Sequence, residues 1–214
     1  MTILNVRGEA TEEVEPDYAN LSCSAVARDE NAPAAQNAAD STAAAMRAAV
    51  ADATGVRSVR LSRVSVHEVR EWNEEKHTHV LVGWEARIGG TCEVDAQSAG
   101  DIAAALVEAG AELGGVTWCL EDTNPAYRRV RKEAVADARR AADDFADALK
   151  ASVGDLVSLA DPGLLSVGGG MPRTEGMLSV AFDTGGSARG KVNVNLDTEF
   201  VTVRAIVEAS YSLA

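Results

Sequence analysis

The stretch RRAADDFADALKASVGDLVSL (residues 139–159) decides the fold, because within it a helix runs through a glycine into a strand. Apolar residues recur at steps of three or four before and along this stretch: Val130, Ala134, Ala138, Ala142, Phe145, Leu149 and Val153. This spacing predicts a helix over 124–152 with one buried stripe. The alanines let the helix lie close to a sheet, with Phe145 and Leu149 filling wider gaps. Gly154 ends the helix, and residues 155–159 begin a strand.

The rest of the chain alternates strands and helices, and neighbouring strands form hairpins. Residues 79–94 and 199–213 alternate apolar and polar side chains, which is typical of half-buried strands. In the strand 59–72, which pairs with 79–94, the apolar phase slips between Leu61 and Val64, which predicts a bulge. Further helices are expected from residue 31 to 55 and from 96 to 109. We therefore predict an α+β fold, with antiparallel or mixed sheets, long hairpins and three main helices on the sheet faces.

A chain of 214 residues is long enough for one large domain or two small lobes. We expect a single domain over 1–214; the alternative is two lobes, about 1–94 and 95–214. Residues 161–190 are rich in glycine and without clear periodicity, so we interpret them as a long flexible loop.

The composition excludes several classes of partner. A formal net charge of −13 disfavours binding to nucleic acids and to anionic membrane surfaces. No apolar run is long enough to span a membrane. No signal peptide is visible at the amino end, so we expect a cytoplasmic protein; the alternative is an exported protein whose sequence begins after processing.

Candidate ligands for a metal or a cofactor are few. His77 and His79 share a strand face, but His67 is expected to pair near Val82, away from both, so we interpret all three as part of a solvated hairpin end. Of the three cysteines, Cys23 and Cys92 lie in apolar strand phases, and Cys119 lies in the opposite phase and faces solvent or a partner. We expect no disulfide, no metal, no cofactor and no catalytic residue.

Two glycine-rich motifs are candidate sites. The sequence GGGMPR, with Gly168, Gly169, Gly170 and Arg173, could form a nest of backbone N–H groups that binds an anion, although a flexible turn is the preferred interpretation. The sequence GGSARG around Ser187 lacks the closing glycine of a nucleophile elbow, so we do not assign it a nucleophile.

The order of motifs resembles the SIMPL-domain family, a group of mostly bacterial, often exported proteins. The resemblance lies in VRGEATEEVEPDYANLS (residues 6–22), GWEA (83–86), the alanine-spaced helix and strand over 133–159, and the last alternating strand. It implies a mixed α/β fold and self-association in at least some members. It also implies a role linked to stress tolerance or protein interaction, with no established reaction and no catalytic residues to carry over.

We therefore expect a non-enzymatic homo-oligomer that also binds other proteins; the alternative is an enzyme or small-ligand binder that uses the Gly168–Arg173 loop. The strand Val80–Val94 would reach roughly 50 Å at about 3.3 Å per residue, whereas a compact chain of this length is about 45 Å across. The hairpin should then bend sharply or project as an arm, with Val69 and Trp72 near its tip inserted against another subunit. In the alternative, it curls over its own sheet and the charged tip, residues 70–77, protects the edge.

Overall fold

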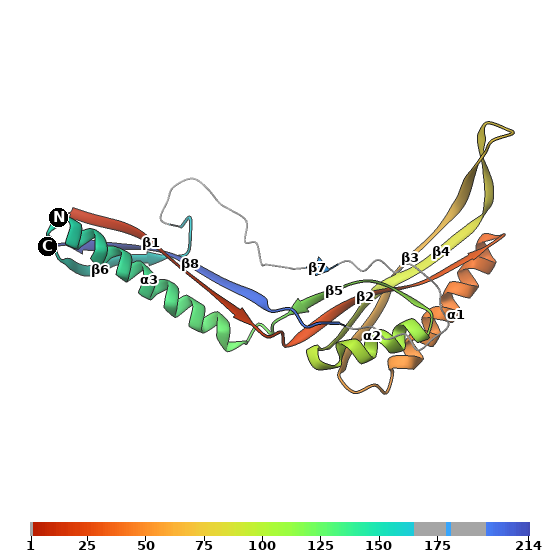
Figure 1. The fold of residues 1–214 in the computed structure, drawn as a ribbon, viewed down its shortest axis with the longest axis horizontal. Helices are drawn as coiled ribbons and strands as arrows, with labels where there is room; N and C mark the ends of the chain where they lie inside the picture. The colour runs from red at the N-terminus through yellow and green to blue at the C-terminus, as the bar shows by residue number, and fades with distance from the viewer. Residues whose placement is uncertain (1, 165–178, 181–195) are drawn as a thin grey trace. The chain divides into compact units, whose positions relative to one another are not determined.

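The computed structural model describes residues 2–164, 179–180 and 196–214, and its α+β architecture confirms the predicted fold class (Figure 1). The chain divides into two compact units. The terminal unit consists of Met1–Glu15, Leu120–Gly176 and Phe200–Ala214, and the central unit consists of Pro16–Cys119 and Met177–Glu199. The units interleave along the sequence. The boundary considered near residues 94 and 95 falls inside the central unit, where a strand ends and a short helix begins.

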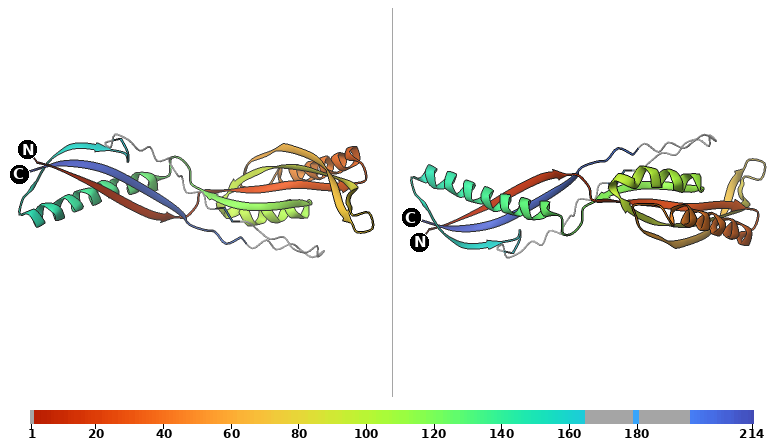
Figure 2. Two further views of the ribbon diagram at one scale, coloured as in Figure 1. Left: turned by 90° about the horizontal axis from the view of Figure 1, so that it is seen from above. Right: turned by 90° about the horizontal axis from the view of Figure 1, so that it is seen from below.

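The terminal unit is built on a three-stranded antiparallel sheet in the order β1 (Thr2–Val14), β8 (Val201–Leu213) and β6 (Val153–Ala160). The first and last strands of the chain pair along their whole length, from Thr2 opposite Leu213 to Val14 opposite Val201. Figure 2 shows β8 between β1 and β6, with the two chain ends together. The edge strand β6 departs from regular register twice.

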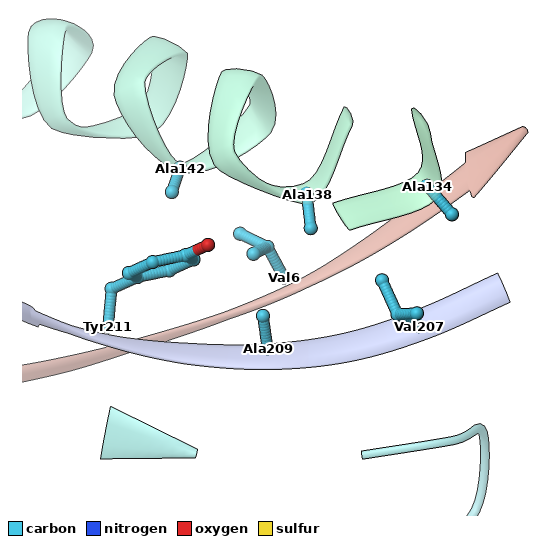
Figure 3. Packing of buried hydrophobic residues seen from close by; sticks show 7 residues of the cluster. All are labelled: Val6, Ala134, Ala138, Ala142, Val207, Ala209 and Tyr211. Atoms are coloured by element: carbon cyan, nitrogen blue, oxygen red, sulfur yellow. The ribbon is translucent and has the colours of Figure 1, made fainter. Parts of the chain in front are cut away.

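Helix α3 (Pro125–Leu149) packs on this sheet through small side chains (Figure 3). The Asn124 side chain caps its first turn by accepting a hydrogen bond from the Ala126 N–H at 2.9 Å, and Pro125 suits the first helical position. The helix ends at Lys150, which adopts the left-handed conformation with φ of 55°. The buried residues occur at every fourth position: Ala126, Val130, Ala134, Ala138, Ala142 and Ala146.

The sequence predicted the buried face of α3 correctly in the middle of the helix and wrongly at its end. Phe145 and Leu149 are 55% and 65% exposed instead of filling gaps at the sheet. Each step of four residues turns the helix by about 40° beyond a full circle, so the buried stripe winds around the axis and reaches Ala146 at the end. Val153, placed on the helix stripe, instead begins β6 and packs against the same core from the sheet.

Helix α3 approaches β1 so closely that a side chain at Gly8 has no room. A Cβ added there would overlap the carbonyl oxygen of Ala134 and the backbone nitrogen of Ala138, and would lie 2.7 Å from the Ala138 Cβ. At the next residue of β1, the Glu9 backbone N–H donates a hydrogen bond to the Asp137 carboxylate at 3.0 Å. The close helix–strand contact therefore depends on glycine in β1 and alanine in α3 together.

The central unit contains an antiparallel sheet in the order β3 (Val56–Asn73), β4 (Thr78–Asp95), β2 (Tyr18–Asp29) and β5 (Ala111–Cys119), with the two-residue β7 (Ser179–Val180) paired to β5. Helices α1 (Ala32–Val50) and α2 (Ala99–Glu108), the latter preceded by the short η1 (Ala96–Ser98), pack on this sheet. Helix α1 buries a stripe of small and apolar residues: Ala35, Ala39, Ala43, Met46 and Val50.

The long β3–β4 hairpin carries the predicted bulge, because its register shifts between Leu61 and Arg63. Pairing of β4 with β2 ends at Asp29 opposite Trp84, whereas pairing of β4 with β3 continues to Asn73 opposite Thr78. Residues 69–83, which we call the hairpin arm, therefore have no third strand beside them in the described part of the chain. Figure 1 shows the hairpin extending past the end of β2.

The register of the hairpin corrects one expectation. His67 lies opposite Glu85 and not near Val82. The tip is the turn over residues 74–77, in which His77 has a φ of 46°, and β4 then has an additional residue, because Val69 faces Gly83 while Arg70 faces Leu81. Counting back from Asn73 opposite Thr78 would place His67 opposite Trp84, and the additional residue moves its partner one position further, to Glu85.

Candidate interaction surface

The β3–β4 hairpin displays large apolar side chains to solvent. Trp72 is 55% exposed and Val64 is 60% exposed; Val66, Leu81 and Val82 are also exposed, whereas Val69 is half-buried. The Trp72 ring meets His79 edge to face, with ring centroids 5.3 Å apart. Of the two residues predicted for the arm, Trp72 is therefore the more exposed.

Three of these apolar side chains, Val64, Val66 and Trp72, lie on one side of the hairpin. Val64 and Val66 lie opposite Ile88 and Ala86, which are buried residues of β4. Since β3 runs without an inserted residue from Arg63 to Asn73, alternation puts Trp72 on the same face as Val64 and Val66. This face is covered further along the sheet by α1 but is exposed at these three positions.

A charged cluster at the base of the arm was not predicted from the sequence. Glu85 is buried; its carboxylate accepts a hydrogen bond from Arg28 Nε at 2.7 Å, with His67 Nε2 3.7 Å away. Neighbouring Arg87 donates to the Ser24 hydroxyl at 2.8 Å and pairs with Glu112 at 2.9 Å. The hydrogen bond from Arg28, opposed by burial, lowers the pKa of Glu85 below its usual 4.5.

This cluster joins four strands beside the point where β2 ends, so it anchors the arm to the sheet. It escapes sequence reasoning because Glu85 is 18 positions from His67 and 57 positions from Arg28, and only the strand pairing brings these residues together. Every charged member has a partner of opposite sign, which is typical of a structural network.

We expect Glu85→Gln to destabilise the protein by about 1–3 kcal/mol at neutral pH, the usual contribution of a hydrogen bond to a charged group. Because the folded pKa of Glu85 is lowered, its contribution is present above pH 4.5 and is lost as the pH falls through the lower folded value. The difference between variant and parent in urea unfolding should therefore shrink below pH 4.5. As a control, Glu112→Gln removes an exposed partner and should change stability by less than about 1 kcal/mol. An equal loss at pH 7 and pH 3 would contradict the assignment.

The cysteines are free and poorly disposed to react. Cys23 and Cys92 are buried, and burial raises the pKa of both thiols, that of Cys92 to about 11. Cys119 is half-buried, its pKa is also raised by burial, and its sulfur accepts a hydrogen bond from the Asn20 amide at 3.6 Å. Thiols with raised pKa values carry little thiolate at neutral pH and are weak nucleophiles.

The other predicted sites lie either on exposed residues or outside the described part of the chain. His67, His77 and His79 are exposed, and the described part of the chain holds no group of three or more residues suited to a metal ion. The loop residues Gly168, Gly169, Gly170 and Arg173, and also Ser187, lie outside the described residues. Within 2–164, 179–180 and 196–214, no helix combines the length and the hydrophobicity that a membrane crossing requires.

Comparison with known proteins identifies a family. A family model described as SIMPL, protein of unknown function (DUF541), matches residues 4–211, which is nearly the whole chain. A search among curated proteins returned no match.

Proposed function

We propose that this protein, which belongs to the SIMPL family, acts by assembling with copies of itself and by binding other proteins, and not by catalysing a reaction. The observation that carries the proposal is the hairpin arm, a two-stranded ribbon with an exposed tryptophan and exposed aliphatic side chains. The proposed connection to stress tolerance rests only on the family resemblance.

The energetics of the arm support this proposal. A two-stranded ribbon is at best marginally stable in water, because it lacks a third strand or a packed helix. Trp72 is among the residue types that contribute most when buried at an interface, and Leu81 and Val82 add apolar area near it. An interface on the arm would bury these side chains and stabilise the ribbon at the same time.

The chemistry of the described residues supports a non-enzymatic role. The buried carboxylate, Glu85, is held ionised by Arg28, so it is not poised to exchange a proton near neutral pH. An open depression of about 350 Å³ on α3 is lined by Arg128, Arg131, Lys132 and Val135, a set without an acid–base pair. The alternative function, ligand binding by Gly168–Arg173, concerns residues outside the described part, and no described residue favours it.

Shortening the arm should reduce self-association. Replacing residues 70–82 with Asn-Gly would close the hairpin at the paired residues Val69 and Gly83 and remove Trp72. In light scattering over a range of concentrations, we expect a parent mass above the 22.3 kDa of one chain and a mass closer to 22.3 kDa for the shortened variant.

The matched point variants are Trp72→Ser, which should act in the same direction, and Leu164→Ser, which removes an exposed apolar side chain elsewhere and should leave the mass unchanged. A parent that is monomeric at every concentration would contradict self-assembly. A shortened variant with the mass of the parent would show that the arm takes no part in it.

A further inference from the structure

The outer side of β3 is a long unpaired strand edge. This strand has 18 residues and lies at the end of the sheet order, so within the described residues only β4 pairs with it. In an antiparallel ladder, the N–H and C=O groups of alternate residues point away from the paired neighbour. Such an edge can accept another strand of similar length.

The first half of β3 is basic, and its second half has a small excess of acidic residues. Arg57, Arg60 and Arg63 lie in the first half, whereas Glu68, Arg70 and Glu71 lie in the second half. Arg60, Arg63 and Glu71 are exposed and form no ion pair with any residue in the described part of the chain, whereas Glu68 pairs with Arg70 on the same strand. Charges on an edge strand commonly prevent pairing, but separated charges favour an antiparallel partner that has the same pattern.

We propose that two copies of the chain join edge to edge through β3, antiparallel, about a two-fold axis at Val66. This inference rests on the proposed function and specifies its interface. A two-fold axis makes the contact self-complementary, so each favourable pair occurs twice. A parallel arrangement would instead place arginine beside arginine and glutamate beside glutamate.

The axis at Val66 follows from the strand phases. Ser62 is the additional residue in the β3 bulge, since Leu61 faces Gly90 and Arg63 faces Gly89. When residues are counted outward from Val66 and Ser62 is left out, Arg60 lies opposite the partner's Glu71. Both side chains are on the strand face that carries Arg63 and His67. On the other face, Val59 lies opposite the partner's Trp72.

Neighbouring registers fit less well. With the axis at Ser65, Arg63 would face the partner's His67, and Glu71 would face the partner's Ser58, so no opposite charges meet. With the axis at His67, Arg63 would face the partner's Glu71, but the two imidazoles would face each other at the axis. The Val66 register keeps the apolar Val66 pair at the centre.

The other sheet edges are less suited to this pairing. Strand β1 carries Glu9, Glu12 and Glu13, and one of its backbone N–H groups is already bonded to Asp137. Strand β6 has two register irregularities, and β5 pairs with β7. In contrast, β3 carries charges of both signs, four arginines and two glutamates, so opposite charges can meet when two copies pair antiparallel.

Charge reversal tests the Arg60–Glu71 contact. Arg60→Glu alone and Glu71→Arg alone should each raise the dimer dissociation constant about tenfold in sedimentation, because each places like charges opposite each other twice. The double variant restores opposite charges and should return to within about threefold of the parent. Arg47→Glu, an equal charge change on the exposed side of α1, serves as the control and should leave the constant unchanged.

Cysteine cross-linking tests the axis. Val66→Cys should give a disulfide-linked dimer under mild oxidation, since residues facing each other across strands have Cα atoms within disulfide range. Val64→Cys should not, because the two copies of residue 64 would be about 13 Å apart along the strands. The parent, with its buried or half-buried cysteines, controls for other disulfides.

The outcomes separate this inference from the proposed function. The β3 interface would be overturned, and self-assembly left intact, by either of two results. One is a dissociation constant that neither charge reversal changes; the other is a cross-linking yield at position 66 no higher than at position 64. A parent that stays monomeric at all concentrations would overturn both. Rescue by the double variant together with selective cross-linking at Val66 would support the interface.

Discussion

Replacing Gly8 with alanine should destabilise the terminal unit by about 3 kcal/mol, at the upper end of the range for overpacked positions. The added methyl group would overlap backbone atoms of α3 at Ala134 and Ala138, and neither a carbonyl oxygen nor a backbone nitrogen can move aside without moving the helix. All three tryptophans, Trp72, Trp84 and Trp118, lie in the central unit. Circular dichroism and hydrogen exchange of α3 during urea unfolding would therefore report the loss better than tryptophan fluorescence.

Gly89→Ala is the matched control for this result. Gly89 is also a buried glycine in a strand, but a Cβ there would lie 3.7 Å from the Ser24 Cβ and 3.9 Å from the Cys23 carbonyl oxygen, an ordinary contact distance. We expect a change of less than about 1 kcal/mol, because alanine lowers the conformational entropy of the unfolded chain and meets no obstruction. Equal stability of the Gly8 and Gly89 variants would contradict the close packing of β1 and α3.

Replacing Ala138 with leucine should destabilise the protein by about 1–3 kcal/mol, the usual effect of inserting methylene groups into a packed core. Ala138 is completely buried and packs in the same cluster as Val6, Val207 and Ala209 (Figure 3). A leucine can be accommodated only if α3 moves away from the sheet, which would also open the contact at Gly8. Urea unfolding followed by circular dichroism would measure the difference.

The same substitution at Ala136 provides the comparison. Ala136 lies on the exposed side of α3, where leucine has a helix propensity close to that of alanine and meets no sheet. We expect its free energy of unfolding to stay within about 0.5 kcal/mol of the parent. If the Ala138 and Ala136 variants unfold at the same urea concentration, the buried face of α3 has been assigned incorrectly.

The elements with sustained periodicity were predictable from the sequence. The alanine spacing predicted the α3 face from Val130 to Ala142, and the phase slip near Leu61 predicted a bulge that the register confirms. The errors lie at the end of α3, where the spacing of apolar residues was the only basis for the prediction. Phe145 and Leu149 fit steps of three or four, but the winding of the buried stripe, which depends on the sheet, leaves them exposed.

The candidate surface was predictable only in part. Trp72 stood out as an exposed aromatic residue near a hairpin tip, and its exposure agrees with that view. The Glu85 cluster and the unpaired edge of β3 depend on which strands are neighbours, and pairing between distant strands leaves little trace in one sequence. The charge pattern of β3 was visible in the sequence, but its meaning depends on β3 being an edge strand.

The full-length pairing of β1 with β8 sets the order in which a newly made chain can fold. The elements of the central unit up to Cys119 are complete long before the last strand is synthesised, so that unit can form while the chain is still growing. Strand β1 must wait for residues 201–213, although it is synthesised before the other strands described above, and closing this contact requires joining two segments far apart in the sequence. A chain interrupted before Val201 would carry a folded central unit behind an unpaired β1, open to pairing with other chains.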